Sequence, residues 1–279
     1  MYRTSIAYNP IARLRMAFKS QKRKRSSIVL GVFATVLASL SFTFMSACAR
    51  ILEPMPSGEM TLFRGIFGLL FLPLLSLVSK EPFYTGRFRG YLSLRGLFGS
   101  IALLFYFLSI EGLTLGDAQI LSQLASFFMC LMAPFFLDEK LPPQAVLPLF
   151  VIAVGTGLVV QIWNFHSFNR FAIYGMAGGF FSAAAYIVIS RLAEKGFKSN
   201  SEIVFYFQIF SILVGLFMVQ NENITMPGGM EWIWTAGLGF FALAAQMFMT
   251  WAFQHVNSII VSFLMYSEIL FHIIYGRIF

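Results

Sequence analysis

The sequence predicts an all-α, polytopic membrane protein, built as an inverted repeat of two helical halves with five and four transmembrane helices. Composition is the first indication: 58% of the residues are hydrophobic and 11% are charged, against about 25% charged in an ordinary soluble domain. Nine continuous apolar stretches, each long enough to cross a hydrocarbon core of roughly 30 Å, are the second. The third is a pattern that begins near Gly31 and begins again near Gly175.

Helices are preferred over a β-barrel because the apolar runs are continuous, whereas barrel strands alternate every second residue. In chain order, we expect the spans at Ile28–Cys48, Met60–Val78, Leu92–Ile110, Ala118–Leu137, Ala145–Ile162, Ile173–Ile189, Ile203–Val219, Trp232–Phe253 and Ser258–Phe279.

The formal net charge of +8 reflects membrane sidedness rather than nucleic-acid binding. Most of the Lys and Arg residues lie before the first span or in segments that share its side, and Arg95 is counted among these. By the positive-inside rule, the N-terminus is therefore cytoplasmic. Residues 1–27 contain no Asp or Glu and are predicted to form a basic cytoplasmic tail beside anionic lipid, although an organellar transit peptide has a similar composition.

The two halves align in register over several helices. Aligning Gly31 with Gly175 pairs Ser46 with Ser190 and Arg64 with Gln208, whereas a slightly smaller shift serves the fourth and ninth spans. We assign residues 28–163 to the first repeat and 171–279 to the second. Because a complete half has an odd number of spans, the second half enters the membrane inverted, as in many secondary carriers.

Four short segments give the repeat a specific resemblance. They are Gly31–Leu40, Leu62-Phe63-Arg64-Gly65, Asp138-Glu139-Lys140-Leu141 and Tyr266-Ser267-Glu268, and together they resemble the EamA-type drug/metabolite transporters. The resemblance implies ten helices in two EamA repeats, cytoplasmic termini and a central cavity for small metabolites. The sequence departs from it by ending at Phe279, before a tenth helix. A truncated product and a nine-helix protein whose terminus lies outside are both left open.

Two charged residues inside apolar spans are the main candidates for substrate contact or coupling. Arg64 lies near the outer end of the second span, where it either snorkels to the headgroups or binds an anionic substrate group or Glu268. Glu268 lies near the middle of the ninth span, too deep to snorkel, so it must be paired, protonated or hydrated. His272 is one helical turn further on, so the two side chains either share a proton or form a static structural pair.

The other candidate site residues are Gln208, which the repeat places opposite Arg64, and Tyr266 and Trp251, whose polar tips suit a cavity lining. Tyr106, Tyr186 and Gln246 are expected to line the same cavity. Glu59 and Glu111, at the outer ends of spans, are interpreted as solvated loop charges.

No nucleotide-binding loop, metalloprotease motif, nucleophile elbow or cluster of His and Cys is present, so we expect no enzyme activity, no metal and no cofactor. The predicted function is a secondary transporter of small organic metabolites or drugs in the inner membrane, acting by alternating access. A non-transporting scaffold or truncated carrier and a nucleotide-sugar carrier on the same fold are the alternatives. The expected partners are a small-molecule substrate and the lipid bilayer, without nucleic acid, and a homodimer is left open.

Overall fold

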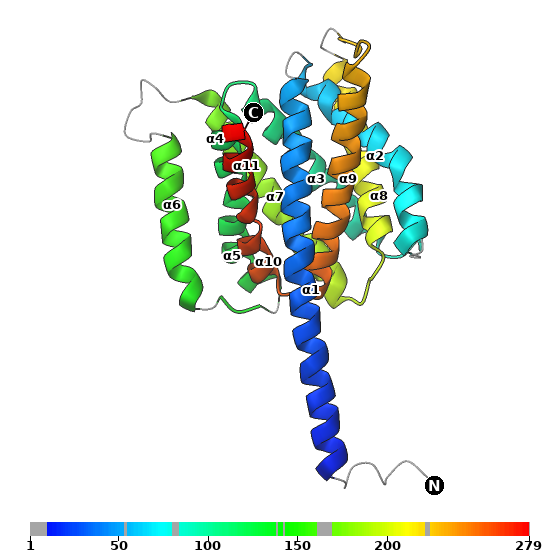
Figure 1. The fold of residues 1–279 in the computed structure, drawn as a ribbon, viewed down its shortest axis with the longest axis vertical. Coiled ribbons are helices and arrows are strands. Elements are labelled where there is room, and N and C mark those ends of the chain that lie inside the picture. The colour runs from blue at the N-terminus through cyan, green and yellow to red at the C-terminus, as the bar shows by residue number, and fades with distance from the viewer. Residues whose placement is uncertain are drawn as a thin grey trace.

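The computed structural model describes residues 10–52, 55–79, 84–137, 139–141, 143–160, 169–220 and 224–278. Within these ranges all regular secondary structure is helical, which confirms the predicted all-α class (Figure 1). The described ranges leave out residues 1–9 of the tail, Asp138 of the Asp138-Glu139-Lys140-Leu141 segment and the terminal Phe279.

The first half contains α1 (Pro10–Ile51), α2 (Ser57–Ser79), α3 (Arg89–Ile110), α4 (Leu115–Ser122), α5 (Leu124–Phe136) and, after the short 3-10 helix η2 (Pro143–Ala145), α6 (Val146–Val160). The second half contains α7 (Arg170–Glu194), α8 (Asn200–Val219), α9 (Glu231–His255), α10 (Ser258–Leu264) and α11 (Ser267–Ile278). Seven helical segments in the described ranges are long and apolar enough to cross a membrane. Two shorter apolar segments, Pro143–Leu158 and Ser258–His272, occupy the remaining predicted spans. The division into five and four crossings stays a prediction.

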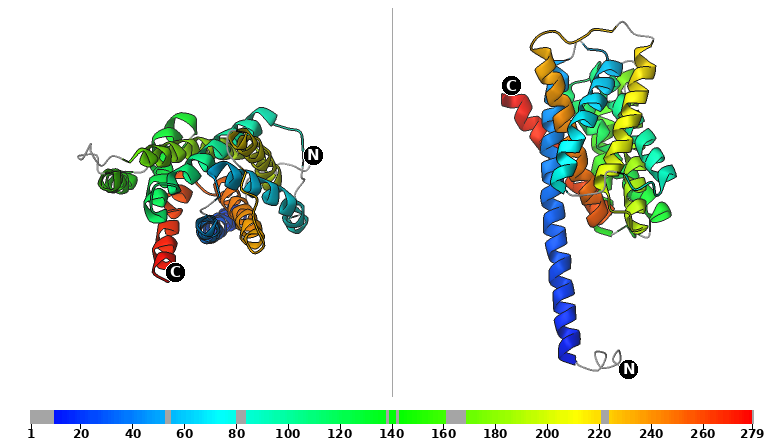
Figure 2. Two further views of the ribbon diagram at one scale, coloured as in Figure 1. Left: turned by 90° about the horizontal axis from the view of Figure 1, so that it is seen from above. Right: turned by 90° about the vertical axis from the view of Figure 1, so that its right-hand side faces the viewer.

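The first helix begins earlier than its apolar stretch. α1 is continuous from Pro10 through the boundary at Ile28, and its N-terminal part projects well below the other helices (Figures 1 and 2). The second part of the basic tail is therefore an extension of the first transmembrane helix rather than a separate segment.

Two spans predicted as continuous helices are broken near their middles. The fourth span divides into α4 and α5 at Gln123, and the ninth divides into α10 and α11 at Met265 and Tyr266. The positions of the two spans do not reveal these interruptions, although the fourth remains long and apolar enough to cross a membrane. Inside a bilayer, a helix break must have its backbone groups satisfied by protein, and the two breaks supply partners to each other, as described below.

The bundle is held by three long helix pairs: α1 packs along α9, α2 along α8 and α3 along α7. Glycines allow the close crossings expected in lipid. A Cβ on Gly239 would lie 2.3 Å from Phe67, and one on Gly215 would lie 2.6 Å from the backbone nitrogen of Leu62. α6 stands at the edge of the bundle (Figure 2), with Leu147 and Phe150 largely exposed as a lipid-facing surface requires.

Structural features of the two halves correspond, with a shift of 143 residues between Glu59 and Glu202 and of 140 residues between Thr85 and Thr225. Glu59 in the first turn of α2 accepts hydrogen bonds from the backbone and hydroxyl of Thr225, just before α9. Glu202 in the first turn of α8 accepts the same pair of bonds from Thr85, just before α3. Each repeat thus holds the loop that precedes the third helix of the other. Both carboxylates are buried, so the interpretation of Glu59 as a solvated loop charge was wrong.

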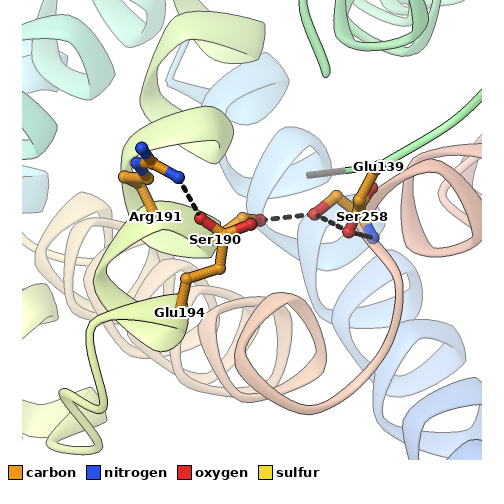
Figure 3. A network of polar contacts seen from close by, with 5 residues as sticks. All are labelled: Glu139, Ser190, Arg191, Glu194 and Ser258. Carbon is orange, nitrogen blue, oxygen red and sulfur yellow. Dashed lines mark hydrogen bonds and ion pairs between the residues drawn. The ribbon is translucent and has the colours of Figure 1, made fainter. Parts of the chain in front are cut away.

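The lower end of the bundle in Figure 1 carries a second polar network, drawn in Figure 3. Glu139 accepts hydrogen bonds of 3.1 Å from both the backbone N–H and the hydroxyl of Ser258 at the start of α10. The Ser258 hydroxyl also lies 2.6 Å from that of Ser190 on α7, and Arg191 forms an ion pair with Glu194 nearby. The glutamate of the Asp138-Glu139-Lys140-Leu141 segment therefore joins the loop after α5 to α10.

Candidate functional site

A cavity of about 80 Å³ lies between the two halves. Its walls come from α1 to α5 and from α7 to α11, so every helix except α6 contributes. Its charged, amide and phenol side chains among the described residues are Arg64, Arg95, Tyr106, Gln119, Gln123, Tyr186, Gln246 and Glu268. A polar chamber enclosed by helices that face lipid is the arrangement expected of a solute-binding site.

Arg64 points into the bundle because of its register on α2. Ile66 and Leu70 are exposed on the lipid side, and a residue two positions from Ile66 is turned by about 200° on a helix with 3.6 residues per turn. The Arg64 side chain is 0% exposed, so it does not reach the outer headgroups. None of its three guanidinium nitrogens has a hydrogen-bond partner within the described residues.

Arg95 is the second buried arginine, and it was not among the expected site residues. It lies on the inner face of α3 with Leu92 and Gly99, is 1% exposed, and therefore does not belong to the basic surface with which it was counted. One guanidinium nitrogen donates a 2.7 Å hydrogen bond to the Gln246 side-chain oxygen. Its Nε and other terminal nitrogen have no partner in the described part of the chain.

Both arginines lie against one aromatic ring. The guanidinium carbon of Arg64 is 4.9 Å and that of Arg95 4.6 Å from the ring centroid of Phe207 on α8. A desolvated cation–π contact contributes about 2 kcal/mol, whereas insertion of an arginine at the centre of a membrane helix costs about 2.5 to 3.5 kcal/mol. The ring therefore offsets only part of the cost of the two charges.

Glu268 lies in the opposite wall, in the first turn of α11. Its carboxylate accepts a hydrogen bond of 3.2 Å from the Gln123 side-chain amide, and it is not bonded to Arg64. At each helix break, a backbone carbonyl group accepts a hydrogen bond from a side chain at the other break. The Gln123 amide donates to the Met265 carbonyl at 3.2 Å, and the Tyr266 hydroxyl donates to the Gln123 carbonyl at 2.9 Å.

His272 is one turn after Glu268 but does not contact its carboxylate through a hydrogen bond in the structure. The His272 Nδ1 lies 2.9 Å from the Glu268 backbone carbonyl and 3.3 Å from the Thr43 hydroxyl on α1. Its Nε2 is buried and has no partner within the described residues. The structure therefore brings the two residues together without forming a side-chain pair.

The remaining candidate residues lie away from the cavity lining. Gln208 is buried where α8 meets α2, with its amide in the space that a Cβ on Gly68 would occupy. Trp251 stacks on His255 near the end of α9, with ring centroids 4.3 Å apart. Tyr266 faces the groove beside α6 while its hydroxyl reaches back to the helix break.

Sequence reasoning found three further lining residues, Tyr106, Tyr186 and Gln246, and missed Arg95, Gln119 and Gln123. Helical spacing gives a signal for Gln119 and Gln123, which lie about two turns and one turn before Ser126, another residue of the cavity lining. Across the described residues, no three His, Cys, Asp or Glu side chains converge as metal ligands would.

Comparisons with known proteins agree with this architecture. Residues 26–161 match the EamA-like transporter family. The chain is 30% identical to the pseudopaline exporter CntI of Pseudomonas aeruginosa, over 89% of this chain and 87% of that protein. An uncharacterized transporter of Helicobacter pylori is 28% identical, with 90% and 87% covered.

More distant relatives share the same overall organisation. Solute carrier family 35 member G1 of Homo sapiens is 23% identical, over 92% of this chain and 74% of that protein. A crystal structure with 15% sequence identity superposes with a TM-score of 0.67 over 91% of this chain and 88% of its own, which shows the shared fold. The chain therefore belongs to the EamA-like transporter family and is a multi-pass integral membrane transporter.

Proposed function

We propose that this transporter is a secondary carrier that moves small organic metabolites across the cytoplasmic membrane by alternating access. Its N-terminus lies in the cytoplasm, and no nucleotide hydrolysis is involved. The observation that carries the proposal is the central cavity, whose lining combines two guanidinium groups, a carboxyl group and several amides within a lipid-facing bundle.

The size of the cavity supports a cycle with more than one conformation. Its volume of about 80 Å³ is well below the roughly 300–1,000 Å³ of typical ligand pockets. A metabolite would enter only if the surrounding helices separate. Besides the three long helix pairs, the halves meet at two broken helices, where side-chain hydrogen bonds join Gln123 to Met265 and Tyr266. We place the movement at this junction.

We further propose export as the physiological direction. The support is the P. aeruginosa relative named as a pseudopaline exporter, which matches nearly the whole chain. Pseudopaline is accordingly one member of the substrate panel to be tested here, alongside amino acids, purines and organic cations.

Transport is tested with the purified protein in proteoliposomes. Vesicles are loaded with the panel, and loss of each compound is followed by mass spectrometry with and without an imposed pH gradient. We expect selective release of one compound class that exceeds release from protein-free vesicles. A membrane scaffold would release nothing above that background under either condition, and this result would overturn the proposal.

A further inference from the structure

The side of the cavity formed by α2, α3, α8 and α9 is strongly basic. Arg64 and Arg95 share the ring of Phe207 there, and both are at least 99% buried. Five of their six guanidinium nitrogens have no hydrogen-bond partner among the described residues. Donors that are buried, unpartnered and directed into a cavity are the complement of an absent acceptor.

The described part of the chain does not supply the counter-charge. Glu268 is the one acidic side chain among the described residues that line the cavity, and it belongs to the opposite wall, where it accepts from Gln123. The other buried carboxylates, Glu59 and Glu202, are bonded to loop backbone at opposite ends of the bundle. Two arginines and one glutamate therefore line the cavity, and no carboxylate of the described residues is bonded to either arginine.

The guanidinium of Arg95 is also held in position. Gln246 accepts from one terminal nitrogen at 2.7 Å, and the other lies over Gly99, only 2.0 Å from where a Cβ would be. The glycine thus provides the space that the cation occupies. Gln246 therefore orients the Arg95 guanidinium, and Gly99 leaves room for it. Both features are expected of a binding site and not of an arginine buried only by helix packing.

We propose that Arg64 and Arg95 together bind an oxyanion of the substrate, a carboxylate or a phosphate, between them in this cavity. The inference rests on the proposed transport function and assigns its substrate class. Guanidinium groups suit this ligand because they present parallel N–H donors that match the oxygens of carboxylate and phosphate. The bound anion would also neutralise the excess positive charge. The counter-charge of the two arginines is then supplied by the substrate and not by a protein side chain.

Binding is measured with small probes that fit the present cavity. Saturation-transfer NMR is recorded for acetate with the protein in nanodiscs, against empty nanodiscs, and competitors are then added. We expect a saturable acetate signal that succinate displaces and that acetamide and methylammonium leave unchanged. Displacement by inorganic phosphate at lower concentration than succinate would identify a phosphate group as the natural ligand, and the opposite order would identify a carboxylate.

Variants separate a binding role from a structural one. We expect Arg64→Gln and Arg95→Gln to weaken acetate binding at least tenfold, whereas Arg87→Gln, which removes an exposed arginine, leaves it unchanged. Gly99→Ala retains both charges but displaces Arg95, and should also lose binding. Gly90→Ala in the same helix is its control, because nothing lies within 4 Å of the added Cβ. Each variant is first checked for a monodisperse elution profile.

Three results would overturn the inference: equal competition by acetamide, absence of a saturable signal for every anion, or wild-type binding by Arg64→Gln and Arg95→Gln. Its failure is distinguishable from failure of the transport proposal. Transport of only neutral or cationic panel members without anion binding refutes the oxyanion site alone. Anion binding without transport of any panel member refutes the carrier alone.

Discussion

At the scale of single residues, the centre of this bundle holds a positive charge that the described residues do not balance. Arg64 and Arg95 are removed from water. Their contacts with the Phe207 ring offset only part of the free energy of burying the two charges. Residues whose burial opposes folding are retained when their role is functional. This trade-off between stability and function has a direct experimental consequence for the free protein.

We expect Arg64→Met to stabilise the ligand-free protein. Methionine keeps much of the side-chain volume and removes an uncompensated cation, and replacement of buried ionic groups by apolar ones often stabilises by about 1 to 4 kcal/mol. The thermal unfolding midpoint in detergent should therefore rise while transport is lost. Arg87→Met, at an exposed site, is the matched control and should change neither the midpoint nor transport. A fall in the midpoint of Arg64→Met would indicate a structural role.

A second residue-scale prediction concerns Glu268. The titratable side chains around it are His272 one turn away and Tyr106 and Tyr186 across the cavity. If its carboxyl group exchanges the coupling proton, Glu268→Gln should still exchange substrate across proteoliposome membranes but should no longer respond to a pH gradient.

Glu231→Gln is a suitable control for this measurement, since the Glu231 carboxylate accepts a hydrogen bond from the Gly228 backbone N–H at the exposed start of α9. If transport by Glu268→Gln responds to the pH gradient as the wild-type protein does, Glu268 takes no part in the coupling step.

The sequence identifies Arg64 and Glu268 because each interrupts a long apolar run. Arg95 lies at a similar depth in its span, but it follows Arg87 and Arg89 on the side where the positive-inside rule expects basic residues, so its charge does not stand out. What buries it is the packing of α3 against α7 and α8. That packing depends on residues far away in the chain, so no local pattern reports it.

At the scale of elements, the two broken helices are the feature that hydropathy does not predict. Neither Gln123 nor Met265 and Tyr266 is a proline or glycine, and the apolar stretches continue across both breaks. The partners that satisfy them are about half the chain apart: the Gln123 amide meets Met265, and Tyr266 meets Gln123. The breaks therefore arise from contact between the repeats rather than from local sequence.

Tyr266→Phe tests this contact by removing one hydroxyl. The Gln123 carbonyl also accepts from the Ser126 N–H, so we expect a modest loss of about 1 kcal/mol, the usual contribution of one hydrogen bond. A lower thermal midpoint would report it. Tyr174→Phe is the matched control, because Tyr174 makes ring contacts and no hydrogen bond of its hydroxyl is found among the described residues. Equal midpoints for both variants would contradict the role of Tyr266.

The small residues of the crossings can be tested in the same way. Gly215 approaches the backbone of Leu62, so the methyl group of Gly215→Ala meets atoms that cannot rotate away. We expect destabilisation by about 1 to 3 kcal/mol, typical of overpacking. Gly155→Ala in α6 has no atom within 4 Å of the new Cβ and should be neutral or slightly stabilising. If the two variants unfold at the same temperature, the α2–α8 crossing is looser than described.

At the scale of the whole molecule, the sequence predicts the helical class well because seven helical segments of the described residues are long and apolar enough to cross a membrane. The correspondence between halves is finer in the structure than in the alignment. Thr114 and Asn257 both cap the first half-helix of a broken span, and both follow the shift of 143 residues that relates Glu59 to Glu202. This capping correspondence involves a single residue in each half, and the residue types differ between the halves. A sequence alignment therefore does not detect it and finds only the apolar pattern that the two halves share.

The orientation of the bundle follows from its charges and can be measured directly. Arg87, Arg89 and Lys198 are exposed near the starts of α3 and α8. The connection from α7 to α8 lies at the lower end of the bundle in Figure 1, from which the basic segment of α1 also extends. The positive-inside rule therefore predicts that this end faces the cytoplasm. Lys198 precedes α8 and Met226 follows it, and a single crossing by α8 puts these two exposed positions on opposite sides of the membrane.

Single cysteines at these positions test the orientation in a background where the buried Cys48 and Cys130 are replaced by alanine. With a membrane-impermeant maleimide, Met226→Cys should label in intact cells, whereas Lys198→Cys should label only after permeabilisation. The cysteine-free background must remain unlabelled in both conditions. The reverse pattern would invert the whole bundle, because the connection through α8 leaves no arrangement in which one loop changes side alone.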